Sequence, residues 1–377
     1  MKKKKLLFIV NVDWFFKSHR LPIALEAIRR GYEVSLATEN SGLFEEFSTY
    51  GIKCYSVAFK RGHSSLLDEL FSIFRVFQLC KKIRPDIIHN VTLKPYLYVA
   101  LVRPLINRKI RIVNAITGLG YLFTGPTKPF LGSFVQFFLK FTLGNGRSNY
   151  FIFQNEDDYK FFKGFLSLRT GSFFFIKGSG VDHLKFRRQI PHAPSGSKKI
   201  QITLVSRMLK DKGVFEFIAA AKKLKESLFG HCVFTLIGGV DLMNPSAITE
   251  SELINELEDE YIIWLGHRND IMDVYNSTDI ACLPSYREGL PKSLVEAMAM
   301  SCPIVSTDVP GCRECVEDGV NGFLVPSRNS DLLADRILLL VGNSELRIKM
   351  GHASRAKMEK EMSLQTVIDQ TFTVYGS

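Results

Sequence analysis

Apolar segments of strand length alternate with helix-like segments along almost the whole chain, and this pattern limits the possible folds more than any other feature. Uninterrupted apolar strands that alternate with helices are typical of parallel sheets covered by helices on both faces. The sequence therefore predicts a doubly wound α/β fold. Its candidate strands are 6–12, 33–38, 53–59, 86–90, 111–116, 150–154, 172–177, 200–206, 232–238, 261–266, 279–285, 303–308 and 322–326.

A polar stretch rich in Pro, Gly and Ser, residues 187–199, interrupts this alternation and is typical of a linker. The chain has 377 residues, which is too long for one ordinary hydrophobic core. We therefore predict two Rossmann-like domains, at 1–185 and 186–359, whose parallel sheets face a central cleft. A C-terminal helix at about 360–377 is expected to pack back on the first domain.

The segment 64–84 is predicted to form a helix of the first domain. Ser65 and Asp68 have the spacing of a capping box, and basic residues stand at the C-terminal end of the segment. Its apolar residues recur at helical intervals, which is the spacing of residues that pack in a core: Leu67, Leu70, Phe71, Phe74, Phe77 and Ile83.

Charge is distributed unevenly between the two halves. Residues 1–185 hold 28 Lys and Arg against 13 Asp and Glu, a net charge of +15, whereas residues 186–377 hold 21 against 25, a net −4. A basic domain favours an anionic partner, which is a membrane surface, a nucleic acid or a phosphorylated substrate. Nucleic-acid binding needs aromatic residues that stack on an open face, whereas the Phe residues here have core spacing, so we expect no nucleic-acid partner.

The chain is expected to be cytoplasmic. No apolar run reaches the roughly 18 residues of a membrane helix. The N-terminus resembles a signal peptide in its basic start, but Asp13 and Trp14 interrupt the apolar stretch and no small-residue cleavage site follows. The seven cysteines are odd in number and scattered, which is typical of reduced thiols inside a cell.

Two kinds of cofactor site are disfavoured by the sequence. Cys312 and Cys315 form a C-x-x-C pair, but the second ligand pair of a zinc site is not visible. The first strand leads into "NVDWFF", which lacks the G-x-G-x-x-G of an NAD-dependent enzyme. We therefore expect neither a metal nor a cofactor.

The segment 286–300, "YREGLPKSLVEAMAM", places two carboxylates around the start of a predicted helix. Glu288 precedes the helix, which begins at Pro291, and Glu296 lies about one turn inside it. Ligands of parallel sheets bind outside the carboxyl ends of the strands, where a helix N-terminus attracts anions. A nucleotide-sugar has the matching order of sugar, diphosphate and ribose. Glu288 is therefore a candidate for the sugar hydroxyls, the helix N–H groups for the diphosphate and Glu296 for the ribose.

Two cations stand at another junction on the same side of the second sheet. Arg207 directly follows strand 200–206, and Lys212 opens the next helix. A guanidinium fork and an ammonium group are a usual pair for a diphosphate. Both residues are therefore candidates to stabilise the charge that develops on a leaving diphosphate.

These residues lie in motifs that resemble retaining glycosyltransferases of the GT-B fold, family 4. Glu288 and Glu296 satisfy the E-x7-E pattern of that family, and Ser301 stands where the family usually has Gly. The resemblance covers the whole chain and is most specific in the second half. The matching motifs are "SRMLKDKG" (206–213), "LIGG" (236–239), "WLGHRNDI" (264–271), "LPSYREGLPKSLVEAMAMSCPIVSTDVPG" (283–311) and "EDGVNGFLV" (317–325).

The resemblance implies that the second domain binds a nucleotide-sugar, in particular a UDP-sugar, and that the first domain binds the acceptor. It assigns the diphosphate to Arg207 and Lys212, the donor sugar to Glu288 and the ribose to Glu296. It also implies retention of anomeric configuration, by attack on the same face through an oxocarbenium-like ion pair, without a metal. The remaining donor-site positions, with the base held beside the loop 266–268, are Gly239, Gly266, His267, Arg268, Gly289, Leu290 and Pro291.

The first half resembles enzymes that extend lipid-diphosphate-linked glycans for O-antigen, capsule or N-glycan assembly. The resemblance rests on "FKSHRLPI" (16–23), "HNVTLKP" (89–95) and "NAITGLGYLFTG" (114–125), and it implies a polyprenyl-diphosphate-linked acceptor. Histidines at strand-end junctions are candidate catalytic groups, and glycines after strand 111–116 are candidates to replace the Gly-rich first loop that this chain lacks. The candidate acceptor residues are His19, His89, Thr92, Lys94, Gly118 and Gly120.

Other activities and a membrane contact remain open on these residues. The alternatives are a soluble acceptor, a GT-B phosphorylase and a nucleotide-sugar epimerase, which turns over its donor without an acceptor. The basic first domain also predicts peripheral docking on the inner face of the cytoplasmic membrane. The segment 128–147 carries Phe residues on a broad helical face and is a candidate for that contact, although most of these rings are expected to pack on the sheet.

Overall fold

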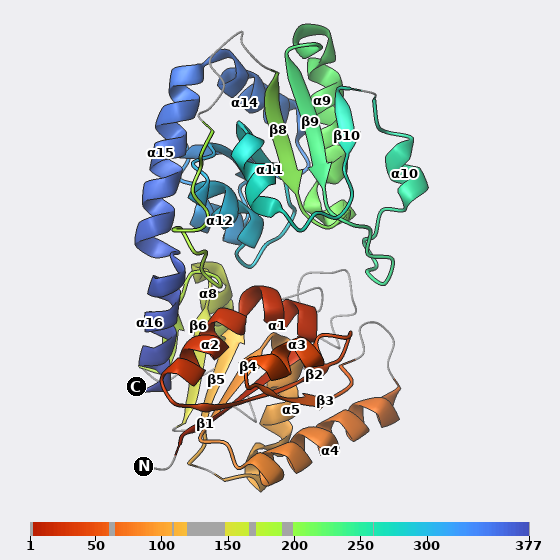
Figure 1. Ribbon diagram of the computed structural model, residues 1–377. Helices are drawn as coiled ribbons and strands as arrows, with labels where there is room; N and C mark the ends of the chain where they lie inside the picture. The colour runs from red at the N-terminus through yellow and green to blue at the C-terminus, as the bar shows by residue number, and fades with distance from the viewer. Residues whose placement is uncertain are drawn as a thin grey trace. The chain divides into compact units, whose positions relative to one another are not determined.

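A computed structural model describes residues 3–59, 65–107, 109–118, 148–165, 171–190, 199–258 and 260–376. The chain forms two compact units, one made of Met1–Ser179 and Val367–Ser377 and the other of Gly180–Thr366 (Figure 1). Each unit contains one parallel sheet with helices on both faces. The predicted doubly wound α/β fold is therefore confirmed.

The first unit is built on seven parallel strands in the order β3-β2-β1-β4-β5-β6-β7. In β1, Phe8 stands opposite Leu36 of β2 and His89 of β4. Because all the strands run in one direction, their carboxyl ends meet at one edge of the sheet. The strands are β1 (Lys5–Val12), β2 (Glu33–Glu39), β3 (Lys53–Ser56), β4 (Ile87–Val91), β5 (Arg111–Ile116), β6 (Asn149–Phe153) and β7 (Phe173–Phe175).

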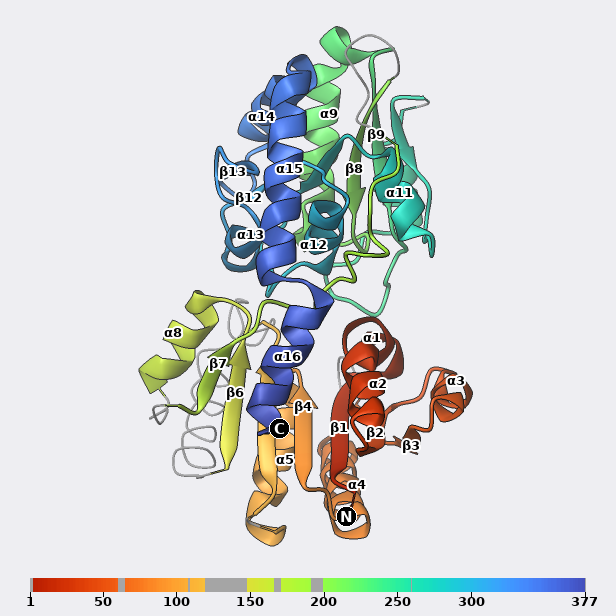
Figure 2. The ribbon, with the colours of Figure 1, turned by 60° about the vertical axis from the view of Figure 1, so that its left-hand side comes forward.

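Helices cover both faces of this sheet. On one face Val76 of α4 and Tyr98 of α5 pack with Ile9 in a buried cluster. On the other face the C-terminal helix α16 lies beside α2, and the rings of Tyr32 and Phe372 meet at 6.0 Å (Figure 2). The helices are α1 (Asp13–His19), α2 (Leu21–Arg29), α3 (Phe44–Thr49), α4 (Leu66–Ile83), α5 (Leu93–Val102), the 3-10 helix η1 (Arg103–Leu105), α8 (Glu156–Phe165) and α16 (Leu364–Tyr375).

The second unit repeats the design with six parallel strands in the order β10-β9-β8-β11-β12-β13. Helices α9 and α14 pack on one face of the sheet, and α12 with α15 on the other. The strands are β8 (Ile200–Val205), β9 (Cys232–Ile237), β10 (Ile262–Trp264), β11 (Ile280–Leu283), β12 (Ile304–Thr307) and β13 (Gly322–Val325). The helices are the 3-10 helix η2 (Lys210–Lys212), α9 (Val214–Leu228), α10 (Glu250–Ile254), α11 (Ile271–Ser277), α12 (Lys292–Ala299), α13 (Pro310–Cys315), α14 (Ser330–Gly342) and α15 (Ser344–Glu361).

Helix α4 differs from its prediction in which residues it buries. The capping box of Ser65 and Asp68 is present. The core residues, however, are Ser72, Val76, Leu79, Cys80 and Ile83, whereas Leu67, Leu70, Phe71 and Phe74 are exposed. Helical spacing identified an apolar stripe correctly, but only the tertiary structure decides which stripe faces the sheet.

Within the described ranges, no helix has the length and apolarity needed to cross a membrane, and no group of three or more His, Cys, Asp or Glu side chains is arranged to hold a metal ion. None of the seven cysteines, all of which lie in these ranges, forms a disulfide. The candidate membrane segment 128–147 lies outside the described residues.

Candidate active site

The carboxyl edge of the second sheet brings several loops into direct backbone contact. Gly213 has a φ of +72°, and a Cβ atom on it would lie 2.1 Å from the carbonyl oxygen of Pro284. A Cβ on Gly311 would lie 2.5 Å from the carbonyl oxygen of Gly289. Side chains are sterically excluded at both positions. The loops after β8, β11 and β12 therefore lie against one another, and the charged groups described below stand on them.

Lys212 and Glu288 form an ion pair at the centre of this edge. The Lys212 Nζ lies 2.6 Å from the Glu288 Oε1, and both side chains are largely buried. The Ser285 hydroxyl donates to the same carboxylate oxygen at 2.7 Å. The Gly311 N–H donates to the backbone carbonyl of Glu288 at 3.2 Å. The carboxylate that precedes α12 is thus held in one place by a cation, a hydroxyl and its own backbone.

Arg207 is held by a carboxylate that the sequence analysis did not single out. Its Nη1 lies 2.5 Å from the Asp241 Oδ2. Arg207 follows β8 and Asp241 lies in the loop that follows β9, so the pair spans two adjacent strand ends. The sequence holds no distinctive signal for Asp241, because it is a single acid in a loop. Each of the two candidate diphosphate ligands is therefore neutralised by a carboxylate of its own unit.

Helix α12 begins at Lys292, with Pro291 as its N-cap residue in an extended conformation. The first N–H groups of a helix have no partner inside it and attract anions. Glu296 is buried one turn inside, and its Oε1 lies 3.0 Å from the Lys292 Nζ. Burial, and then the charge of Glu296, raises the pKa of Tyr275 well above its usual value. Glu288 and Glu296 thus stand on either side of the helix start, each paired with a different lysine.

The loop after β10 lies next to the end of β9. The Gly238 N–H donates to the Gly266 carbonyl at 2.8 Å, and the Trp264 indole donates to the Gly238 carbonyl at 2.8 Å. A Cβ on Gly239 would lie 3.7 Å from the His267 Cβ, so these two residues are neighbours. The strand order β10-β9-β8-β11 therefore sets out the loop 266–268, Asp241, Arg207 and Glu288 in series along one edge.

Cys312 is packed behind the Glu288 loop. Burial, and then the charge of Glu288, raises the pKa of this thiol to about 12. The thiol stays protonated near neutral pH, and a protonated thiol is a poor nucleophile. The C-x-x-C pair is accordingly part of the core.

His89 was predicted to lie at a strand end, but it lies inside strand β4. It is the third residue of β4, it is 1% exposed, and its Nδ1 lies 2.5 Å from the Tyr375 hydroxyl of α16. Burial, followed by the charge of Arg20, lowers the pKa of His89 well below 6.5. The imidazole is thus neutral and attaches the C-terminal helix to the sheet.

The other candidate acceptor residues have distinct positions at the carboxyl edge of the first sheet. His19 ends α1, stacks on Phe15 at 4.0 Å, and its Nδ1 lies 2.6 Å from the Ser18 hydroxyl. Thr92 has a φ of +74° and precedes α5, where the Lys94 Nζ lies 2.6 Å from the Glu69 Oε1. Gly118 has a φ of +124°. Gly120 lies outside the described residues.

Asp13, which was not a candidate from the sequence, holds the loops of this edge together. It is fully buried where β1 ends, and its carboxylate accepts from the Ser41 N–H at 2.6 Å and the Leu43 N–H at 3.3 Å. It also accepts from the Trp14 N–H at 2.7 Å. A carboxylate thereby organises the segments after β1 and β2, in a chain that lacks a Gly-rich loop after its first strand.

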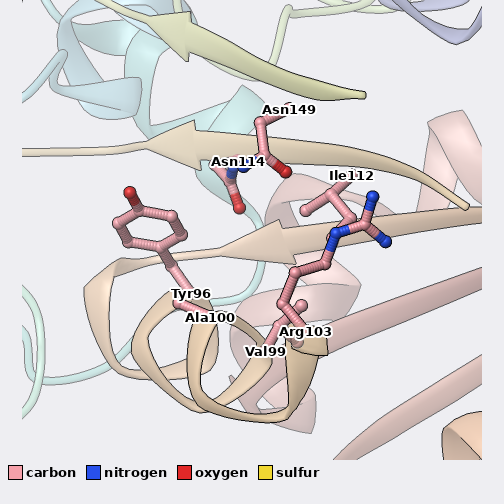
Figure 3. Close-up of a pocket in the computed structure, with 7 residues that line it drawn as sticks. All are labelled: Tyr96, Val99, Ala100, Arg103, Ile112, Asn114 and Asn149. Carbon is pink, nitrogen blue, oxygen red and sulfur yellow. The ribbon is translucent and has the colours of Figure 1, made fainter. Parts of the chain in front are cut away.

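A small pocket lies between α5 and strands β5 and β6 of the first unit (Figure 3). None of the candidate donor or acceptor residues lines it. Tyr96 and Asn149 each carry a buried polar atom at this pocket that has no hydrogen-bond partner among the described residues. Its lining residues are Tyr96, Val99, Ala100, Arg103, Ile112, Asn114 and Asn149.

Two family models match the chain, one in each half. The model described as "Glycosyl transferases group 1" matches residues 186–357. The model described as "Glycosyl transferase 4-like" matches residues 5–155. Together they cover every strand of the two sheets except β7, and every candidate site residue that lies in the described ranges.

Curated relatives and solved structures align along almost the full chain. An N,N'-diacetylbacillosaminyl-diphospho-undecaprenol alpha-1,3-N-acetylgalactosaminyltransferase of Campylobacter jejuni is 27% identical over 88% of each chain. A UDP-Gal:alpha-D-GlcNAc-diphosphoundecaprenol alpha-1,3-galactosyltransferase of Escherichia coli is 23% identical over 91% of this chain and 89% of that protein. The Anabaena protein HepE, solved in complex with UDP and glucose, superimposes with a TM-score of 0.77 at 18% identity and covers 99% of each chain.

Proposed function

The chain belongs to the group 1, family 4 glycosyltransferases of the GT-B fold, and from that premise we propose that it moves a hexose or N-acetylhexosamine from a UDP-sugar to a polyprenyl-diphosphate-linked glycan. The observation that carries this proposal is the Lys212–Glu288 pair, which stands beside the start of α12 at the carboxyl edge of the second sheet. The names of the Campylobacter and Escherichia relatives support the acceptor class, because both act on undecaprenyl-diphosphate-linked sugars.

The donor is assigned to the second unit. In our proposal the first N–H groups of α12, with Arg207 and Lys212, take the diphosphate. Glu288 takes hydroxyls of the transferred sugar, and Glu296 takes those of the ribose. The base lies beside the loop 266–268, in contact mainly with backbone. The diphosphate must then replace Asp241 as the partner of Arg207 and share Lys212 with Glu288.

The acceptor is assigned to the carboxyl edge of the first sheet. His19, Thr92, Lys94 and Gly118 are its candidate ligands there, with Gly120 as a sequence-based candidate. We leave His89 out of this set because its ring is enclosed between Phe8 and Tyr375.

The reaction breaks the bond between the anomeric carbon and the donor phosphate oxygen, and forms a bond between the same carbon and the acceptor oxygen. The leaving diphosphate gains negative charge as the first bond breaks. Fixed cations and oriented N–H groups stabilise such charge most in the transition state. In the same-face route the acceptor proton passes to the leaving phosphate oxygen, and configuration is retained. A metal ion is not needed to neutralise the leaving group when Arg207, Lys212 and the helix start do so.

The enzyme is further proposed to work as a peripheral protein on the cytoplasmic membrane. The net charge of +15 in residues 1–185 supports attraction to an anionic surface. A polyprenyl-linked acceptor is confined to such a surface, so a basic acceptor domain brings the two together.

A donor screen tests the activity. The protein is incubated with a panel of UDP- and GDP-sugars, with and without a short-chain polyprenyl-diphosphate sugar, and lipid-linked product is measured. We expect product from a UDP-sugar only when the lipid is present. Donor turnover without the lipid supports the epimerase, and product on a free glycan supports the soluble acceptor.

A further inference from the structure

The N-terminal half of α4 presents its apolar side chains to solvent. Five large apolar residues of this half, Leu66, Leu67, Leu70, Phe71 and Phe74, are between 52% and 83% exposed. They occupy one face of the first two and a half turns. Figure 1 shows this end of α4 extending past the short edge strand β3, at the right of the first unit. An exposed cluster of this kind marks an interaction surface more often than a tolerated defect.

The inward face of the same half is polar. The Ser72 hydroxyl donates to the carbonyls of Ala58 and Asp68 at 2.7 and 2.9 Å. Glu69 accepts from the Tyr98 hydroxyl and pairs with Lys94 at 2.6 Å. The usual pattern of a surface helix is therefore inverted here, since polar groups attach this half of α4 to the unit and apolar groups face outward. The apolar exception in this half is Ile73, which is partly buried against the core cluster, and full apolar burial begins at Val76.

The chain on either side of this surface is basic in sequence. The segment 53–111, which contains β3, α4, β4 and α5, has 12 Lys and Arg against 3 Asp and Glu, a net charge of +9. Arg75, Lys81 and Lys82 are exposed on the C-terminal half of α4 itself. An apolar stripe flanked by cations is complementary to an anionic bilayer, in which apolar groups enter the acyl boundary and cations meet the headgroups. A protein partner of ordinary composition offers no such match to the charge.

We infer that α4 is the membrane-docking element of this enzyme, with Leu66, Leu67, Leu70, Phe71 and Phe74 inserted into an anionic lipid surface. The inference rests on the proposed function and specifies its membrane partner. Lys94, a candidate ligand of the acceptor, contacts Glu69 in the first turns of this helix. Docking through α4 therefore places the acceptor edge of the first sheet at the level of the headgroups, where the diphosphate of a polyprenyl substrate lies.

The direct test is co-sedimentation of the full chain with phosphatidylglycerol-rich vesicles at low salt. We expect the double variant Phe71→Ser/Phe74→Ser to lower the partition coefficient at least about tenfold, because two inserted aromatic rings are removed. The matched control is Phe229→Ser/Ile254→Ser in the second unit, where the two side chains are 55% and 57% exposed. The control should bind vesicles as wild type does. Both variants change exposed positions, so both should keep the wild-type unfolding temperature.

A second variant separates the charge from the apolar contact. Lys81→Gln/Lys82→Gln should weaken binding to anionic vesicles roughly fivefold per residue, and leave the weak binding to neutral phosphatidylcholine vesicles unchanged. Equal losses on both kinds of vesicle contradict electrostatic docking on this helix.

Transfer to a water-soluble, short-chain diphosphate acceptor distinguishes this inference from the proposed function. Phe71→Ser/Phe74→Ser should retain wild-type transfer in that assay and lose it with acceptor embedded in vesicles. Wild-type vesicle binding by the double variant overturns the inference. The inference is also overturned if the wild-type protein is a dimer and the double variant is a monomer, because α4 is then an interface between two copies. Vesicle binding without transfer to any lipid-diphosphate sugar would leave the docking surface intact and refute the proposed function instead.

Discussion

The carboxyl edges of the two sheets are built in different ways. In the second unit, Gly213 and Gly311 allow loops to touch through their backbones, and Lys212 and Glu288 stand on those loops. In the first unit, the buried carboxylate of Asp13 organises the loops through hydrogen bonds. A close backbone contact requires glycine at a fixed position, so it leaves a motif in the sequence. A hydrogen-bonded edge can be built from many residues, and it leaves none.

The comparison predicts that the largest losses of activity follow changes at the second edge. Arg207→Ala and Lys212→Ala should each remove about 2–4 kcal/mol of transition-state stabilisation, as loss of one oxyanion donor does, and lower kcat/KM by about 30- to 1000-fold. Lys210→Ala is the control. Lys210 lies two residues before Lys212 and forms an exposed ion pair with Glu252, so this variant should leave transfer unchanged. Near wild-type kcat in a folded Arg207→Ala variant contradicts the assignment.

The two carboxylates around α12 should separate catalysis from nucleotide binding. Glu288→Ala should abolish transfer and leave the affinity for UDP equal or higher, because Lys212 loses its internal partner. Glu296→Ala should weaken UDP about tenfold or more, since it removes charged hydrogen bonds to the ribose. Calorimetric titration of both variants with UDP measures this, and the reverse pattern means that the two roles are exchanged.

The His89–Tyr375 contact of the first unit, which lies inside the sheet and not at its carboxyl edge, should affect stability more than chemistry. Tyr375→Phe removes the partner of the buried His89 and should lower the free energy of unfolding by about 1–3 kcal/mol. The folded variant should keep the wild-type kcat, as measured below its unfolding temperature. A loss of kcat without a loss of stability would show that the pair acts in the reaction.

Breaking the Arg207–Asp241 pair at Asp241 should have a smaller effect than the changes above, and it should improve donor binding instead of weakening it. Asp241→Asn should lower the KM for the donor about two- to fivefold, the range of a partly exposed ion pair, because the diphosphate no longer competes with a carboxylate. The gain should fade at high salt, where such pairs are screened. A higher KM in the variant indicates that Asp241 itself contacts the donor.

The smallest expected effect is that of chelation. Excess EDTA should leave the rate unchanged, because two cations and a helix start neutralise the leaving group in our proposal. Full loss of activity that Mg²⁺ or Mn²⁺ restores contradicts the metal-free mechanism.

The same contrast explains which parts of the fold and of the candidate site could be predicted from the sequence alone. It predicted both parallel sheets, and it singled out Arg207, Lys212, Glu288 and Glu296 because each stands near a strand end or a helix start. It did not find Asp241, since a single acid in a loop has no distinctive spacing. Only the structure shows that this carboxylate meets Arg207 across two adjacent strand ends.

In the first unit the sequence was less informative for a physical reason. The predicted strand 86–90 placed His89 near a strand end, but the bond to Tyr375 depends on a residue that lies 286 positions away in the chain. The apolar stripe of α4 was found by its period, yet its direction depends on where Ser72 and Glu69 find partners. Periodicity reports that a helix has two faces, whereas tertiary contacts decide which face is buried.

A crystal structure with an intact UDP-sugar or a slow analogue tests the central claim most directly. We predict that the diphosphate oxygens lie within hydrogen-bond distance of Arg207, Lys212 and the first N–H groups of α12, with the sugar beside Glu288 and the ribose beside Glu296. A nucleotide bound elsewhere, with the Arg207–Asp241 pair still closed and the start of α12 without a phosphate, contradicts it.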